Sequence, residues 1–267
     1  MNSQRPAGSV TYCNSGRVVL VSGGAGGIGR AICAAFARSG AAVVSCDVSQ
    51  PDPEQRVPDV TYLQGNVACE SDCASVVEQT IVRHGALDVL VNNAAIQPPS
   101  SYQPLDLLAA ESWQRMLDVN LSGYTFLAKH AVRQMLEQVS GVIVNISSAQ
   151  GHRTARQVPA YGPIKAANLM QARQWGVEYA RRGVRVVSVS PGAINTPLVR
   201  ASLDVQGGGE QLASRHPLGR IGDPQEVAAA VLWLCSAAAS FVTATDLAVD
   251  GGLGAFGAFA DPYPPSS

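Results

Sequence analysis

The chain contains few charged residues, and their signs are nearly balanced. Charged residues make up 15% of its 267 residues and hydrophobic residues 46%. This composition is typical of a globular chain with a well-buried core, and it excludes a disordered or fibrous one. The formal net charge is -1 and no basic residues cluster in a run, so we expect neither nucleic acid nor an anionic membrane as partner. The expected partner is a small molecule.

Paired cysteines are also missing. The six cysteines are scattered, without a C-x-x-C pair or neighbouring clusters of histidine, which favours reduced thiols. Cys69 and Cys73 are four residues apart and could share a helix face. Two thiols without further ligands are more often structural than metal-binding, so no metal is expected.

Long apolar runs are absent as well. Residues Met1 to Ser15 are polar and lack the apolar segment of a signal peptide, and no uninterrupted apolar run reaches membrane-spanning length. We therefore expect no membrane partner, and the cytoplasm as the default location.

Short β-branched runs alternate with helical stretches along the chain. The runs are continuously apolar, as strands covered by helices on both faces require. The expected strands are Val18 to Val21, Ala42 to Cys46, Val60 to Leu63, Leu87 to Val91, Val142 to Ile146, Val184 to Val189 and one near Leu247 to Val249. Since no linker divides the pattern, the sequence predicts an α/β fold: a single-domain, doubly wound (Rossmann-type) parallel sheet with helices on both faces.

Helix ends are marked by basic residues followed by glycine, which suit the last turn and the position beyond it. These ends are Arg38-Ser39-Gly40, Arg83-His84-Gly85 and Arg182-Gly183. A later helix is expected to begin after Asp223, with Pro224 at its first position and Glu226 at its third, and to run to about Ser236.

Two regions fall outside this alternation. The segment Asn195 to Pro217 contains three successive glycines and no steady periodicity, which is typical of a mobile lid; an ordinary surface loop is the alternative. The tail, residues 254–267, either packs on a neighbouring subunit or frays. The expected organisation is an extension of residues 1–15, one domain of residues 16–253 with a lid at about 195–217, and the tail 254–267.

A glycine-rich turn, Ser22 to Gly29, links the first expected strand to the apolar helix Ile32 to Ala37. Glycine lets the backbone turn tightly and approach a pyrophosphate, and a helix N-terminus presents free N–H groups. Structural turns also use glycine, but the strand before and the helix after favour a dinucleotide site.

Asp47 ends the next expected strand, eighteen residues after Gly29, about where an acidic side chain accepts hydrogen bonds from the adenosine ribose. Its carboxylate would repel a 2′-phosphate, and no Lys or Arg stands among Ser22 to Gly29 to neutralise one. NAD is therefore the expected cofactor. The alternative is an aspartate that only begins the turn before Pro51.

Tyr161 and Lys165 stand four residues apart on an expected helix from about Ala160 to Arg181, so they share one face. A phenol is a poor base at neutral pH, and an adjacent ammonium lowers its pKa. Of the two lysines in the chain, one is here. Ser148 follows the strand that ends at Ile146, where ligands of such sheets bind. Taken alone, these residues would indicate a solvated helix face and a turn cap.

From about Gly16 to Gly252 the chain resembles the short-chain dehydrogenase/reductase family, of its shorter type. The motifs that carry the resemblance are Ser22-Gly23-x-x-x-Gly27-Ile28-Gly29, Asn92-Asn93-Ala94-Ala95, Val119-Asn120-Leu121, Ile146-Ser147-Ser148, Tyr161-x-x-x-Lys165, and Pro191-Gly192 with Thr196. The resemblance implies an enzyme that transfers a hydride between NAD and a secondary alcohol or ketone.

The resemblance also implies roles for four catalytic residues. Tyr161 would exchange the hydroxyl proton, Ser148 would hold the substrate oxygen, and Lys165 would tune Tyr161 and bind the nicotinamide ribose. Asn120 would hold a water that links Lys165 to solvent; the alternative is a polar residue bonded within its own helix.

The implied cofactor site is larger than the glycine turn. Its residues are Ser22, Gly23, Gly27, Ile28, Gly29, Asp47, Asn66, Val67, Asn93, Ala94, Ala95, Tyr161, Lys165, Pro191, Gly192, Ile194 and Thr196. Asn66 departs from the aspartate usual in the family, although an amide can still donate and accept there. Pro163 is also unusual, and only its place near a helix start makes it tolerable.

The expected substrate wall is mostly apolar with a few amides, which suits a moderately apolar alcohol, such as a cyclic alcohol, a diol or a steroid-like one. It comprises Ile96, Gln97, Pro98, Gln150, His152, Val158, Ile194 and Leu198. Ser148, Gln150 and Tyr161 are the predicted substrate-binding residues, and His152 is either a contact or merely solvated.

The resemblance suggests a homotetramer. Rival hypotheses are a silent NAD-sensing or scaffold relative, and an epimerase or dehydratase.

Overall fold

The computed structural model describes residues 8–203 and 208–257. Seven strands form one parallel sheet in the order β3-β2-β1-β4-β5-β6-β7. They are β1 (Val18–Ser22), β2 (Ala42–Asp47), β3 (Val60–Gln64), β4 (Val89–Asn92), β5 (Gly141–Ile146), β6 (Val184–Pro191) and β7 (Asp246–Val249). The chain order reverses between β1 and β4, and in such sheets the carboxyl ends flanking the reversal open a crevice.

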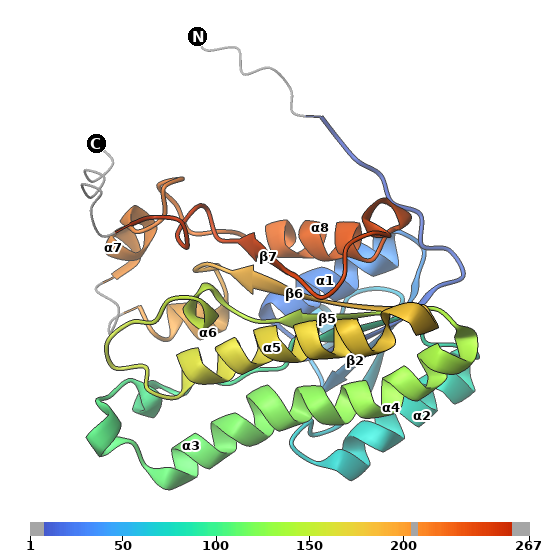
Figure 1. Ribbon diagram of the computed structural model, residues 1–267, viewed down its shortest axis with the longest axis horizontal. Coiled ribbons are helices and arrows are strands. Elements are labelled where there is room, and N and C mark those ends of the chain that lie inside the picture. The colour runs from blue at the N-terminus through green and yellow to red at the C-terminus, as the bar shows by residue number, and fades with distance from the viewer. Residues whose placement is uncertain (1–7, 204–207, 258–267) are drawn as a thin grey trace.

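Helices cover both faces of the sheet (Figure 1). The helices are α1 (Gly27–Arg38), α2 (Glu70–His84), α3 (Ala110–Leu117), α4 (Gly123–Gln138), α5 (Tyr161–Tyr179), α6 (Pro197–Arg200), α7 (Gly208–Ser214) and α8 (Pro224–Leu234). Helices α1 and α8 pack together on one face, whereas α2, α4 and α5 contribute to the core on the other. The predicted doubly wound fold is confirmed.

Successive side chains of a strand pack alternately into the two cores on either side of the sheet. On β1, Val19 and Val21 belong to the core beneath α1 and α8, and Leu20 belongs to the opposite core. All three are fully buried. A strand that is buried on both faces cannot alternate apolar and polar residues, which explains the continuous apolar runs in the sequence.

The predicted helix ends are confirmed. Gly40, Gly85 and Gly183 have φ angles of 89°, 77° and 83°, a left-handed conformation that glycine adopts without strain. At the start of α8 the Asp223 and Glu226 side chains form a capping box with the main chain. α5 is followed by a short 3-10 turn, Ala180–Arg182, so the helical segment ends as predicted.

The segment 195–217 is more regular than predicted. It contains α6 and α7, and only residues 204–207 lie outside the described part of the chain. His216 is buried and fixes this segment: its Nδ1 lies 2.9 Å from the Leu212 carbonyl, and its Nε2 accepts from Ala193 N–H at 3.1 Å. Leu212, four residues before His216, is also buried, so these two side chains anchor α7. Whether the segment moves as a lid stays a prediction.

The two chain ends lie beyond the alternating core. Of the predicted tail, residues 254–257 are described, and Arg153 Nη1 donates to the Phe256 carbonyl at 2.7 Å; residues 258–267 lie outside the described part, as do residues 1–7. None of the described helices is long and apolar enough to cross a membrane. All six cysteines are unpaired, and the described residues hold no group of three or more His, Cys, Asp or Glu side chains arranged for a metal.

Candidate active site

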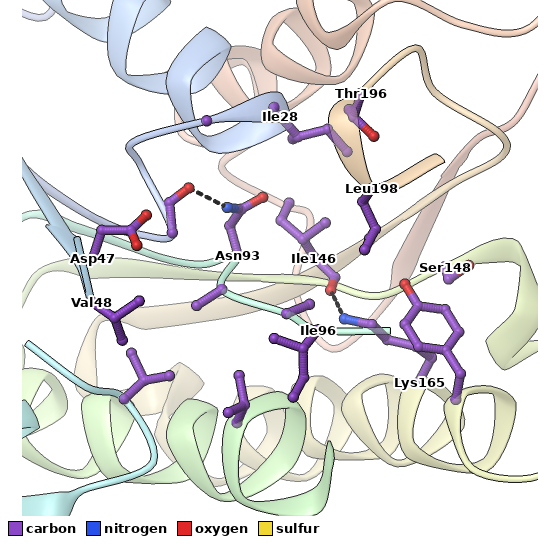
Figure 2. Close-up of a pocket in the computed structure, with 18 of the residues that line it drawn as sticks. Ile28, Asp47, Val48, Asn93, Ile96, Ile146, Ser148, Lys165, Thr196 and Leu198 are labelled. Atoms are coloured by element: carbon purple, nitrogen blue, oxygen red, sulfur yellow. Dashed lines mark hydrogen bonds between the residues drawn. The ribbon is translucent and has the colours of Figure 1, made fainter. Parts of the chain in front are cut away.

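A cavity of about 940 Å³ lies at the carboxyl ends of the strands. Its walls come from the segments after β1, β2, β3, β4, β5 and β6 together with α3, α5 and α6. Figure 2 shows Asp47 and Val48 at one end of the cavity, and Ser148 and Lys165 at the other. All predicted cofactor residues line it except Ser22 and Gly29.

The glycine turn at one end depends on two residues that cannot carry a side chain. Gly23 has a φ angle of 65°, and a Cβ there would lie 2.8 Å from Ala94 Cα. A Cβ on Gly29 would collide with the carbonyl oxygen of Gly23. Gly29 therefore acts by letting α1 begin against the turn, not by lining the cavity.

The N-terminus of α1 opens into this cavity without a side-chain cap. Its N-cap residue is Gly26, and its first turn contains no acidic residue. Gly26, Gly27 and Ile28 all line the cavity. The first N–H groups of a helix lack partners within the helix, so this end fits the pyrophosphate of a dinucleotide.

Hydrogen bonds of Ser22 and Asn93 stabilise the glycine turn. The buried Ser22 Oγ accepts from the N–H groups of Asn93 and Ala94 at 3.0 and 3.1 Å. Asn93 Nδ2 donates to the carbonyls of Ser22 and Gly23 at 2.9 and 3.1 Å. The serine hydroxyl thus ties β1 to β4 rather than facing the cavity.

Asp47 stands at the end of β2 with its carboxylate beside the turn. Asp47 Oδ2 accepts from Ala25 N–H at 3.2 Å, which fixes the side chain at the rim of the cavity. The basic residues among the described lining are Arg115 on α3 and Lys165 on α5, neither on the strands or loops next to Asp47. Asn66 lies nearby, and its Oδ1 accepts from Ala68 N–H, so this departure from the family pattern caps its own turn.

Ser148, Tyr161 and Lys165 meet at the other end. Ser148 Oγ accepts from Gln150 N–H at 3.1 Å and hydrogen-bonds the Tyr161 hydroxyl. Pro163 lies in the first turn of α5, where its missing N–H breaks no helical bond, and Ile164 N–H still donates to the Ala160 carbonyl at 3.1 Å. The unusual proline therefore leaves Tyr161 and Lys165 on one helix face.

The pKa of Tyr161 moves opposite to the direction that the sequence predicts. Burial raises this pKa above its usual value, the neighbouring Tyr102 phenol adds to the increase, and the hydrogen bond with Ser148 opposes it. Desolvation of the phenolate outweighs the help expected from Lys165.

Lys165 is almost completely buried, with 1% of its surface exposed. Its Nζ donates to the Ile146 carbonyl at 2.8 Å and to the Tyr124 hydroxyl at 3.2 Å. Burial lowers the pKa of Lys165 to about 7, from its usual 10.5. The same desolvation thus acts against the charge on both members of the pair.

Asn120 is buried in a π-helical turn, Asp118–Ser122, between α3 and α4. Its side chain pairs with the main chain of Ile96, donating to the carbonyl and accepting from the N–H, both at 2.8 Å. Its own carbonyl accepts from Asn168 Nδ2 at 3.0 Å. Asn120 is therefore bonded outside its own helix, and it fixes Ile96, which lines the cavity. Its relay role stays a prediction.

The predicted substrate wall divides between two cavities. Ile96, Ile194 and Leu198 line the main cavity. Gln150, His152 and Val158 line a neighbouring one of about 430 Å³, whereas Gln97 and Pro98 line neither. His152 is not merely solvated, because its Nε2 lies 2.8 Å from Asp246 Oδ2.

Two amides near these cavities have buried atoms that bond nothing in the described part of the chain. These atoms are Nε2 of Gln97 and Oε1 of Gln150. Gln97 follows the cavity residue Ile96, and Gln150 donates its N–H to Ser148. Five other buried side-chain atoms of the described residues are likewise unpaired, so these two do not by themselves identify a binding site.

Sequence reasoning missed the tyrosines Tyr102 and Tyr124 beside Tyr161 and Lys165. Tyr124 stands four residues after Asn120, a spacing that places both on one helix face and could have identified it. Tyr102 lies in an irregular loop, where no periodicity indicates which side chains face inward.

Comparisons with known proteins identify the family of the chain. The model of the family described as enoyl-(acyl carrier protein) reductase matches residues 23–254. The chain is 39% identical over 243 residues to the cis-4-hydroxycyclohexanecarboxylate dehydrogenase of Sinomonas cyclohexanicum, covering 88% of this chain and 96% of that protein. It is 36% identical over 244 residues to the 2,5-dichloro-2,5-cyclohexadiene-1,4-diol dehydrogenase of Sphingobium indicum, covering 89% and 97%.

A solved structure is similar over nearly the same span. The ligand-free aldohexose dehydrogenase of Thermoplasma acidophilum superposes with a TM-score of 0.86 at 33% identity, covering 92% of this chain and 97% of that one.

Proposed function

The chain belongs to the short-chain dehydrogenase/reductase family of oxidoreductases, and on that premise we propose that it transfers a hydride between NAD(H) and a moderately apolar secondary alcohol or ketone. One observation carries the proposal: a single cavity joins an uncapped helix N-terminus and Asp47 to the cluster of Ser148, Tyr161 and Lys165. This is the arrangement that a dinucleotide and a small alcohol need when they react side by side.

The proton chemistry belongs to the protein. In the oxidising direction Tyr161 must first give up its own proton, which burial disfavours. As the phenolate it then takes the proton of the substrate hydroxyl, while Ser148 donates a hydrogen bond to the substrate oxygen. The bound nicotinamide supplies the carbon that accepts the hydride. The Lys165 ammonium favours the phenolate electrostatically and offers a donor to the ribose, and Asn120 provides the proton with a path to solvent through a water.

Asp47 supports NAD over NADP. The carboxylate accepts ribose hydroxyls well, but it repels a phosphate at the same place. No basic residue of the described lining stands next to it to offset that repulsion. The cofactor contacts proposed for Gly23, Gly27 and Ile28 follow from the helix end that they form.

For the substrate we propose a cyclic secondary alcohol that carries a second polar group. The relatives named above act, by their names, on a hydroxycyclohexane carboxylate and a cyclohexadiene diol. Ile96, Ile194 and Leu198 offer an apolar wall for a ring, and the second polar group is proposed from the substrates that the names of these relatives give.

We also propose a homotetramer. On α5, Met170 and Val177 are 58% and 74% exposed, seven residues apart and therefore on one face. Phe241 is fully exposed. Exposed apolar side chains on one helix face support association between copies of the chain, and gel filtration at several concentrations measures it.

The test is to follow NAD reduction across cyclic alcohols, cyclic diols, ring hydroxyacids and hydroxysteroids, with NAD and NADP in parallel. We expect turnover with NAD on at least one ring alcohol and much less with NADP. Tight NAD binding without turnover on any substrate would instead favour the silent sensor, and equal rates with NADP would overturn the role of Asp47.

A further inference from the structure

Lys165 has a second tyrosine as a neighbour besides Tyr161. The Tyr124 hydroxyl accepts a hydrogen bond from Lys165 Nζ at 3.2 Å and donates one to the Ile146 carbonyl at 3.0 Å. The same carbonyl accepts from Lys165 Nζ at 2.8 Å. Nζ, the hydroxyl and the carbonyl oxygen thus form a closed triangle of hydrogen bonds at the end of β5.

The fold holds Tyr124 rigidly in this position. It is the second residue of α4, directly after the π-helical turn that carries Asn120, and none of its surface is exposed. Its main-chain carbonyl accepts from Asn92 Nδ2 at 3.3 Å. Its ring lies 5.1 Å from Lys165 Nζ, slightly closer than the ring of Tyr161 at 5.7 Å.

We propose that Tyr124 is the positioning residue of Lys165. An ammonium has three N–H donors, and Tyr124 and Ile146 take two of them, so the third is directed toward the cavity. A free lysine side chain samples many rotamers, and the triangle removes that freedom before any ligand binds. Only the catalytic consequence rests on the function proposed above; the contact itself is a property of the chain.

Charge considerations point the same way. The Tyr124 hydroxyl already donates to Ile146, so its oxygen is left to accept, and accepting favours the ammonium over the neutral amine. The titratable groups that face Lys165 Nζ are Tyr124 on α4 and Tyr161 on α5. Burial raises the pKa of both phenols, so in the chain without coenzyme or substrate both stay neutral while Lys165 titrates.

The alternative is that Tyr124 only fills space and satisfies the Ile146 carbonyl. The chain offers an unusual way to separate the two. It has two lysines, so lysine labelled with ¹³C at Cε gives two signals in an NMR spectrum. Lys129 is half exposed and paired with Glu70 at 2.6 Å, and it serves as the internal reference.

The experiment is a pH titration of these signals in the full chain and in Tyr124→Phe, without substrate or coenzyme. We expect Lys165 of the unmodified chain to titrate near pH 7, and its pKa in Tyr124→Phe to be lower by about 1, because one acceptor of the ammonium is lost. Tyr179→Phe removes a phenol from the same core without touching Lys165, and should leave the titration unchanged. An unchanged Lys165 pKa in folded Tyr124→Phe would overturn the proposal.

A second measurement does not depend on the variant folding. In the unmodified chain, through-space magnetisation transfer between Lys165 Cε protons and the ring protons of Tyr124 should be observed, and its absence would also overturn the proposal. With a ring alcohol as substrate, turnover by Tyr124→Phe should fall about tenfold. Because the titration needs no turnover, a failed titration rejects the positioning role and a failed assay rejects the proposed reaction.

Discussion

The coenzyme end of the cavity presents main-chain N–H groups, whereas the catalytic end presents the side chains of Ser148, Tyr161 and the buried Lys165. At the first end, Gly23 and Gly29 bring the backbone close, and the cost is conformational. At the second, burial disfavours the charges on Tyr161 and Lys165, and the cost is electrostatic. Substitutions at the coenzyme end should therefore distort the backbone and weaken coenzyme binding. Substitutions at the catalytic end should remove a charge and lower turnover, while the fold stays intact.

At the coenzyme end, Gly29→Ala should cause the largest loss of both stability and NAD binding. The added Cβ collides with the Gly23 carbonyl, so the start of α1 must shift. We expect a stability loss of about 2 kcal/mol and NAD binding weaker by about a hundredfold, measured by denaturation and by titration calorimetry. At Gly26 a Cβ would meet nothing within 4 Å, so Gly26→Ala should keep its stability. Equal stability loss in both variants would contradict the account.

Lys165→Met should show the opposite behaviour at the catalytic end. Turnover should fall by about a hundredfold or more, yet the protein should be as stable as before or more stable, because a buried charge is replaced by an apolar side chain of similar length. Thermal unfolding and steady-state assays on the same samples test this. A large loss of stability would show that Lys165 holds the fold together.

The pH dependence of stability sharpens that prediction. An unfolded lysine keeps a pKa near 10.5 and folded Lys165 has about 7, so above pH 7 the unfolded chain binds more protons and stability rises with pH, by at most about 1.4 kcal/mol per unit. From pH 9 the buried Cys33, Cys46, Cys73 and Cys235, whose pKa burial raises to about 12, act in the opposite direction. Between pH 7 and 9, the stability of Lys165→Met should therefore not increase with pH.

Asp47→Asn tests the specificity of the coenzyme end without altering its shape. The amide keeps the size of the side chain but removes the charge that repels a 2′-phosphate. The ratio of kcat/KM with NAD to that with NADP should fall about tenfold, mainly through better use of NADP. An unchanged ratio would mean that Asp47 does not face the ribose.

Glu226→Ala should have the smallest effect, since it lies in neither end. Its carboxylate accepts from Asp223 N–H at 2.8 Å and from both terminal nitrogens of Arg220, at 2.7 and 2.9 Å. Loss of this cap should cost about 1 kcal/mol of stability and leave kcat and KM unchanged. Altered kinetics would indicate that α8 is coupled to the cavity.

The two ends also differ in how far the sequence predicts them. The backbone conformation of the coenzyme end requires glycine at particular positions, and this requirement is visible in the sequence. The sequence therefore predicts the strand, the glycine turn, the helix and Asp47, and each lies where it is predicted. Tyr161 and Lys165 also lie on one helix, as predicted. Patterns of this kind identify residues that share one element.

What the sequence does not show is contact between elements. Tyr124 reaches Lys165 from another helix, and His152 reaches Asp246 across 94 positions. The predicted direction of the Tyr161 pKa shift is wrong for the same reason, because the shift depends on desolvation by the whole fold rather than on the nearest charge. The π-helical turn that directs Asn120 to Ile96 likewise leaves no periodic signal.

The central claim is that Tyr161 carries the proton while other residues hold the coenzyme. The most direct measurement compares NAD reduction and NAD binding in Tyr161→Phe and in the unmodified chain, on the ring alcohol that gives the highest turnover. The account predicts a loss of turnover of about a thousandfold with an NAD dissociation constant changed by less than about tenfold. Undiminished turnover in the folded variant would contradict it.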